Sequence, residues 1–275
     1  DRTPGVSEPS QPRVMGIVNT TPDSFSDGGR HATLEAAVAH GLKLVEQGAD
    51  ILDIGGESTR PGAEPVNVEE EIARTAPVIA ALRARWPGPI SIDTLKAEVA
   101  VAAVEAGATM WNDVSALEHS PDSLAVAARL GCDVVLMHMQ GQPRTMQDAP
   151  VYDDVQAEVS AYLLARAEAA MAAGVTREHI WLDPGIGFGK TVQHNLTLIA
   201  GLDRLIDTGF PVLFGASRKR MILGLDPTAV APSDRLGGSL ALALEAARRG
   251  ADIIRVHDVR ETVQALAVQT AVGAA

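Results

Sequence analysis

The sequence has little cysteine, no long apolar run and no excess of positive charge. Cys132 is the single cysteine among 275 residues, so no disulfide can form within the chain. Its place at the start of an apolar run predicts a buried, unreactive thiol in a cytoplasmic protein. No apolar run approaches the length of a membrane-spanning helix. Lys and Arg total 23 against 35 Asp and Glu, a net charge of −12. This balance argues against nucleic acid or an anionic membrane as a partner of the whole surface, while it permits a local pocket for a small anion.

Several common motifs of catalysis are also missing. The chain has no HExxH or CxxC pattern, no carboxylate-rich metal cluster and no GxSxG nucleophile motif. The glycine-rich segment 184–191 looks like a phosphate-binding loop, but the Walker pattern requires glycine at the position of Pro184. We interpret this segment as a loop at the mouth of a site, in which Phe188 contacts a flat substrate.

One phrase recurs along the chain. A glycine, often with a small residue and an aspartate, leads into three or four apolar residues that end at a polar one. Clear copies are found at 48–53, 107–112, 131–138 and 250–255, and looser ones at 174–183 and 209–215. Glycine is favoured just past the end of a helix, and a short apolar run is typical of a strand buried on both faces. The phrase therefore predicts repeated helix-to-strand joints with polar residues at one edge of the sheet.

The elements expected from this pattern alternate along the chain. Strands are predicted at 13–18, 51–54, 89–92, 110–112, 134–137, 180–182, 212–214 and 253–256. Helices include 33–47, 68–85, 95–104, 155–173 and 236–249. Eight strand-plus-helix units favour a closed α/β barrel, the (β/α)8 TIM barrel, over an open doubly wound sheet, and the length suits that fold. We predict a single barrel domain over 13–275, preceded by a flexible lead-in, 1–12, with three prolines.

Three acceptor side chains follow separate strands. Asp93, Asn112 and Asp183 stand at the ends of the third, fourth and sixth predicted strands. Each alone could be a helix cap or a turn former. Because the carboxyl ends of barrel strands meet at one mouth, the three are expected to lie together. Such a group suits a ligand rich in N–H donors, such as the edge of a heterocycle.

Cationic side chains follow the last two strands. Arg218, Lys219 and Arg220 come after the seventh strand, and Arg255 and His257 share one face of the eighth. Either a buried ion pair or a bound phosphate explains an arginine in an apolar strand, and loops after strands seven and eight commonly hold phosphate in barrels. We expect these residues to form a cationic pole opposite the acceptor pole.

Two long loops complete the predicted mouth. The loop 19–29 is polar with Phe25 in its middle and Gly28-Gly29 at its base, which fits either a lid or an ordinary surface loop. The loop 55–62 carries Arg60 beside hydroxyl groups, which suits an anionic ligand or a solvated turn.

Together these segments resemble one enzyme family. Seven motifs at strand ends carry the resemblance, at 19–29, 55–62, 91–94, 112–114, 183–190, 215–220 and 255–258. Over residues 13–270 the chain resembles dihydropteroate synthases, pterin-binding barrel enzymes of folate biosynthesis that are targets of sulfonamides. The resemblance implies a transferase that joins 6-hydroxymethyl-7,8-dihydropterin pyrophosphate to p-aminobenzoate and releases pyrophosphate. A homodimer is also implied.

The resemblance implies a role for each matching residue. The pterin would be bound by Asp93, Asn112, Asp183 and Lys219. The pyrophosphate would be held by Asn19, Arg60, Arg255 and His257, with Asn19 as a ligand of Mg²⁺. The p-aminobenzoate would be bound by Thr59, Arg60, Pro61, Phe188, Ser217 and Lys219. Catalysis would be SN1-like and depend on Phe25, Asp27, Lys219, Arg255 and His257, with Phe25 and Asp27 shielding a cationic pterin methylene.

Three alternatives share part of this pattern. A pterin-binding methyltransferase has the same barrel, but it has no pyrophosphate to hold. A paralogue that binds pterin without turnover would differ only in an incomplete set of motifs. A phosphate-binding barrel of sugar metabolism would not need three acceptor side chains in one mouth.

Overall fold

Eight parallel strands form the centre of the molecule. The computed structural model describes residues 11–22, 29–60 and 62–275. The sheet has the order β6-β5-β4-β3-β2-β1-β8-β7. Its strands are β1 (Arg13–Asn19), β2 (Ile51–Gly55), β3 (Ile90–Asp93), β4 (Met110–Asp113), β5 (Asp133–Met137), β6 (Ile180–Asp183), β7 (Leu213–Phe214) and β8 (Ile253–Val256).

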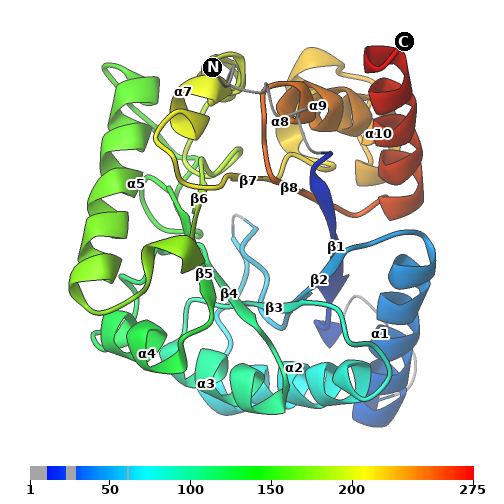
Figure 1. The fold of residues 1–275 in the computed structure, drawn as a ribbon, viewed down its shortest axis with the longest axis vertical. Coiled ribbons are helices and arrows are strands. Elements are labelled where there is room, and N and C mark those ends of the chain that lie inside the picture. Colours follow the sequence, from blue (N-terminus) through cyan, green and yellow to red (C-terminus); the bar gives the residue numbers. More distant parts are fainter. Residues whose placement is uncertain (1–10, 23–28, 61) are drawn as a thin grey trace, which may run out of the picture.

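The two ends of the sheet meet at β6 and β7. Leu182 on β6 forms a single parallel bridge with Val212, and its N–H donates to Pro211 O at 2.9 Å. This joint closes the strands into a ring (Figure 1). The predicted (β/α)8 barrel is therefore confirmed.

Helices surround the ring on its outer side (Figure 1). They are α1 (Gly29–Glu46), α2 (Val68–Arg83), α3 (Ala97–Ala106), α4 (Ser123–Leu130), α5 (Val155–Ala172), α6 (Val192–Ala200), α7 (Leu202–Ile206), α8 (Arg220–Leu225), α9 (Leu236–Arg248) and α10 (Val259–Gly273), with short 3-10 turns at Arg177–His179 and Pro232–Arg235. No helix in the part of the chain that the structure describes has the length and apolarity needed to cross a membrane.

The glycines of the recurring phrase adopt the expected conformation. Gly48 and Gly107 follow α1 and α3 with φ of 105° and 121°, a region where a side chain would be strained. Each is followed by a buried strand, as the phrase predicts.

One expected helix begins later than its pattern suggests. Residues 95–104 were predicted to be helical, but α3 begins at Ala97. The Thr94 hydroxyl accepts from Lys96 N at 3.1 Å and donates to Glu71 at 2.7 Å. The local turn and the bond to the buried Glu71 use this hydroxyl, and the N-cap position of α3 is taken by Lys96, which forms no side-chain cap hydrogen bond.

The interior of the barrel is apolar at one level and polar at the next. A separate buried cluster fills the ring with Met15, Ile51, Met110, Val135, Trp181, Leu213 and Ile253. Because alternate strand residues share a face, the residues two places further along also face inward. Four of these inward positions hold polar side chains, namely Asp53, Asn112, Asp183 and Arg255. The apolar layer is thus the floor of a polar site at the carboxyl ends of the strands.

Candidate active site

Arg255 lies at the centre of the polar layer. Its Nε donates to Asp53 Oδ2 at 2.7 Å and its Nη2 donates to Asp93 Oδ2 at 3.3 Å. Asn112 Nδ2 donates to the same Asp53 oxygen at 3.2 Å. The expected separation into a cationic and an acceptor pole is therefore wrong for Arg255, which reaches across the barrel interior to carboxylates. A buried arginine without such partners would be strongly destabilising.

Asp93 and Asp183 hold their protons more tightly than a free carboxyl group does. Burial and the nearby charge of Asp53 raise the pKa of Asp93 to about 8, although Arg255 acts in the opposite direction. Burial also raises the pKa of Asp183, opposed mainly by Lys219. Asp183 Oδ1 accepts from Gly185 N at 2.8 Å. The layer thus combines acceptors whose charge responds to what binds beside them.

Lys219 lies next to Asp183 and the glycine-rich loop. Burial lowers the pKa of Lys219 to about 8, while the charge of Asp183 raises it. Its Nζ donates to Ile186 O and lies 4.8 Å from the centre of the Phe188 ring. The contact between the Lys219 ammonium group and the Phe188 ring holds the ring in a position where it can contact a flat ligand.

Ser217 and His257 form a second polar pair. The His257 backbone N–H donates to Ser217 Oγ at 3.1 Å, and Ser217 Oγ lies 2.9 Å from His257 Nδ1. Burial and the charges of Arg255 and Arg218 lower the pKa of His257 to about 3. The imidazole is therefore neutral at pH 7. In the tautomer with its proton on Nε2, the ring accepts from the Ser217 hydroxyl at Nδ1 and provides a hydrogen-bond donor rather than a charge.

Comparisons with known proteins match the sequence and the fold of this chain. The family model described as pterin binding enzyme matches residues 15–257. Dihydropteroate synthase of Escherichia coli (strain K12) is 51% identical over 259 residues, covering 94% of this chain and 91% of the relative. The chain belongs to the dihydropteroate synthase family. Xanthomonas albilineans dihydropteroate synthase solved with 4-aminobenzoic acid has a TM-score of 0.91 and 56% identity, covering 97% of this chain and 94% of that one. The same enzyme in complex with 7,8-dihydropteroate has a TM-score of 0.88 and 52% identity, over 98% and 96% of the two chains.

The predicted family is thus confirmed, and the activity is that of a dihydropteroate synthase, a transferase. In this synthase fold, the acceptors predicted for the pterin, Asp93, Asn112 and Asp183, all reach the inner polar layer. Lys219, Phe188, Ser217, Arg255 and His257 also gather at this end of the barrel.

The predicted cluster of three adjacent cations does not form. Arg218 has a positive φ of 58° and forms two bonds to Asp258, at 2.8 and 3.1 Å. Arg220 begins α8 and is exposed. Of the three, Lys219 makes the contacts with the loop that carries Phe188. The positive φ at Arg218 directs the neighbouring side chains toward different partners. The sequence of three adjacent cations does not reveal this conformation.

The two mouth loops of the synthase are described in part. Thr59 is half-buried, and Arg60 is exposed, yet its charge is among those that lower the pKa of His257. Asn19 ends β1 and lies beside Gly55 in the register. Phe25, Asp27 and Pro61 lie outside the described residues.

Asp53 was missed as a site residue. It lies inside β2 and is 1% exposed, whereas most of the predicted site residues lie at the end of a strand or in the loop after it. The signal was present, because Asp53 ends one copy of the recurring phrase just as Asn112 ends another.

Lys190, at the end of the glycine-rich loop, was also missed. Its Nζ donates to Gly185 O at 2.8 Å, Phe188 O at 2.9 Å and His138 O at 3.2 Å, and lies 2.9 Å from His138 Nδ1. Burial lowers the pKa of Lys190 to about 7 and that of His138 to about 3. A Cβ at Gly185 would lie 1.9 Å from His138 O, so glycine is required for this close approach. Lys190 thus holds the loop that carries Phe188.

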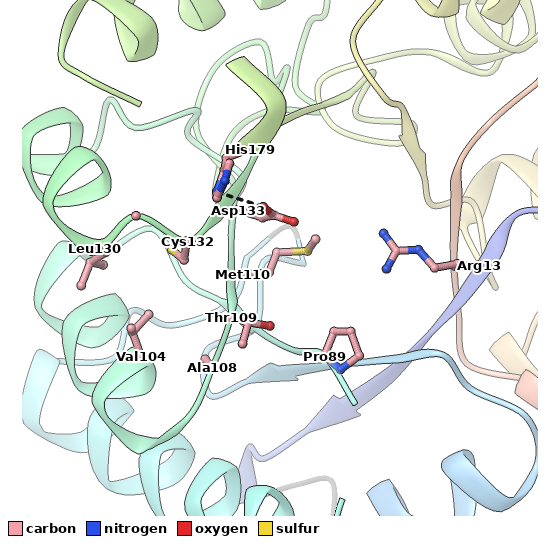
Figure 2. Close-up of a pocket in the computed structure, with 11 residues that line it drawn as sticks. Arg13, Pro89, Val104, Ala108, Thr109, Met110, Leu130, Cys132, Asp133 and His179 are labelled. Atoms are coloured by element: carbon pink, nitrogen blue, oxygen red, sulfur yellow. Dashed lines mark ion pairs between the residues drawn. The ribbon is translucent and has the colours of Figure 1, made fainter. Parts of the chain in front are cut away.

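A cavity of about 440 Å³ lies at the opposite, amino end of the barrel (Figure 2). Arg13 extends toward Met110, and His179 forms an ion pair with Asp133 at 3.3 Å. Cys132 also lines this cavity, and burial raises the pKa of its thiol to about 11. None of the predicted substrate-binding residues that the structure describes lines this cavity.

Proposed function

We propose that the site at the carboxyl ends of the strands catalyses the joining of 6-hydroxymethyl-7,8-dihydropterin pyrophosphate to p-aminobenzoate. The observation that carries the proposal is the layer of acceptors at Asp93, Asn112 and Asp183, above an apolar floor. The pterin 2-amino group and N3–H would donate to Asp183, while Asp93 and Asn112 support the ring. Lys219 would donate to an acceptor of the pterin. An acceptor-rich floor with one adjacent ammonium suits the donor-rich edge of this heterocycle.

The pyrophosphate would lie between β1 and β8. Arg255 engages its acid partners through Nε and Nη2, which leaves Nη1 for a phosphate oxygen. The neutral His257 would donate from Nε2. Arg60, on the second loop, would add a charge at the exposed side. These donors would stabilise the charge that develops on the leaving pyrophosphate.

The residues present fit a magnesium ion that arrives with the substrate. No group of three or more His, Cys, Asp or Glu suited to a metal occurs among the described residues. Mg²⁺ commonly uses one or two protein oxygens, with phosphates and waters completing its shell. Asn19, at the end of β1, offers one such oxygen. A bound Mg²⁺ would neutralise phosphate charge.

The chemistry we propose is SN1-like. The bond between the pterin methylene carbon and the phosphate oxygen breaks first, and its electron pair leaves with pyrophosphate. The amine of p-aminobenzoate then attacks the cationic carbon and loses a proton, so no strong base is required. Phe25 and Asp27 would cover the cation, Asp27 through its charge.

The p-aminobenzoate would lie beside the glycine-rich loop. Phe188, Ser217 and Lys219 lie at the same end of the barrel as the proposed pterin site, and Thr59, Arg60 and Pro61 would close the other side. Lys219 could then contact both substrates, which would fix their relative orientation. We also propose a cytoplasmic homodimer, by resemblance to the family; light scattering measures the oligomeric state directly.

The first experiment follows pyrophosphate release from the purified protein with pterin pyrophosphate and Mg²⁺. We expect release that depends on p-aminobenzoate. Omission of p-aminobenzoate and omission of protein are the controls. Pterin binding without release would instead identify a paralogue without turnover, and absence of pterin binding would refute the proposed site.

A further inference from the structure

We propose that Asp53 is a positioning residue of the pterin site: it sets which end of the Asn112 amide faces the ligand and holds the Arg255 guanidinium beside Asp93. The inference rests on the proposed pterin site. Neither the sequence motifs nor the roles implied by the family resemblance assign a function to this residue.

The carboxylate of Asp53 connects three strands through one oxygen. Its side chain on β2 is fully buried. Oδ2 accepts both from Arg255 on β8 and from Asn112 on β4, at 2.7 and 3.2 Å. Oδ1 accepts no hydrogen bond from any residue that the structure describes. A change at this one oxygen therefore acts on two binding side chains at once.

The first consequence concerns the direction of the Asn112 amide. A carboxylate only accepts hydrogen bonds, so Asn112 must turn its nitrogen toward Asp53. Its oxygen then lies on the other side of the amide group. Asn112 is 4% exposed, so water offers little competition for this orientation. Asp53 thus makes Asn112 an acceptor toward the ligand, which adds to the acceptors at Asp93 and Asp183.

The second consequence concerns Arg255. Asp53 and Asp93 share the guanidinium, each accepting from a different nitrogen. Without the Asp53 charge, the same two nitrogens would be free to engage Asp93 alone in a bidentate pair. Asp93 would then lose acceptor capacity for the pterin, and Nη1 would move away from its place for the phosphate.

The test is Asp53→Asn, which keeps the size of the side chain. We expect the affinity for pterin pyrophosphate, measured by calorimetry, to fall about tenfold or more, because buried hydrogen bonds to a charged acceptor are lost. At saturating pterin pyrophosphate, the KM for p-aminobenzoate should change less than about twofold, since that substrate does not contact the Asp53 network. Equal losses for both substrates, or no loss for the pterin, would overturn the proposal.

Asp113→Asn is the matched control. Asp113 is a fully buried carboxylate that accepts from Ser115 N at 2.8 Å and Leu117 N at 3.0 Å. It follows Asn112 on β4 and therefore faces the outer side of the barrel. This variant should keep its pterin affinity even if its stability falls. A loss equal to that of Asp53→Asn would show a general effect of removing a buried acid.

A double-mutant cycle separates positioning from simple structural damage. Asn112→Ser removes the side chain through which Asp53 is proposed to act. The loss of pterin affinity from Asp53→Asn should then be smaller in the Asn112→Ser background, because the two share one path. Full additivity would overturn the proposed route through Asn112.

Asp53→Ser, which is smaller and neutral, replaces Asp53→Asn if the latter does not fold, with the same selective loss expected. If the unmodified protein binds no pterin pyrophosphate, the proposed function fails. If it binds and the Asp53 variants bind equally well, this inference alone fails.

Discussion

The two ends of the barrel both carry charged side chains, but they place them in different surroundings. At the carboxyl end, the Asp53 side chain is 0% exposed and that of Arg255 is 21% exposed. At the amino end, the side chains of His179 and Asp133 are 42% and 34% exposed. Exposed pairs contribute little to stability because water screens them, whereas buried charges depend on every partner they have. Groups with strongly shifted pKa values concentrate at the end where the pterin is proposed to bind, as expected for a functional site.

Lys190→Met should give the largest change in stability at the carboxyl end. The variant leaves three carbonyl oxygens and His138 Nδ1 without their donor, so we expect the free energy of unfolding to fall by about 2 kcal/mol or more. Urea denaturation measures this. Lys43→Met, at an exposed position on α1, is the control and should change stability by less than about 0.5 kcal/mol. Equal effects of the two variants would contradict the claim that a buried charge contributes more to stability through its partners than an exposed one.

The pH dependence of stability provides a second test of the difference between the two ends of the barrel. The pKa of Asp93 is raised from 3.8 to about 8 on folding, so between these values the folded protein binds more protons than the unfolded chain. The contribution of Asp93 to stability is therefore present at low pH and lost as the pH rises toward 8. Asp93→Asn should become more stable relative to the unmodified protein over this range, by an amount on the order of 1 kcal/mol. Thermal or urea denaturation from pH 4 to 8 would show this.

Asp133→Asn, at the amino end, is the control for that series. It removes one member of a partly exposed pair, so its effect on stability should be small. A flat difference between Asp93→Asn and the unmodified protein would mean that Asp93 loses its proton as readily when folded as when unfolded.

The smallest effect is expected from Arg13→Gln at the amino end. The Arg13 guanidinium carbon lies 5.4 Å from the centre of the Trp181 ring, and an exposed contact of this kind contributes about 1 kcal/mol or less. The kcat and both KM values should not change, because Arg13 lies at the end of the barrel opposite the proposed site. A clear loss of activity would show that the two ends are coupled.

The sequence predicted the barrel because its signals are local. A glycine that requires positive φ and a buried apolar run lie within a few residues of each other, so each helix-to-strand joint can be read in one place. The acceptors at Asp93, Asn112 and Asp183 were predicted for the same reason, since each ends a strand.

The remaining features depend on contacts that no short segment contains. Asp53 meets Arg255 across 202 residues of sequence. Lys190 is held by backbone carbonyls, which every residue has and no motif marks. The neutral state of His257 follows from burial and nearby cations. These contacts and protonation states depend on the register of the strands and on how deeply each side chain is buried. Neither can be deduced from the sequence before the strands are arranged in a ring.

Because a single bridge joins β6 to β7, we expect local opening of the barrel to occur first at that joint. β7 has two residues, so few backbone bonds resist local opening there. The joint runs between the strand that ends in Asp183 and the strand that leads to Lys219. A pterin that forms hydrogen bonds with both side chains would link the two strands across this joint. Substrate binding would therefore also make local opening of the barrel at the joint less frequent.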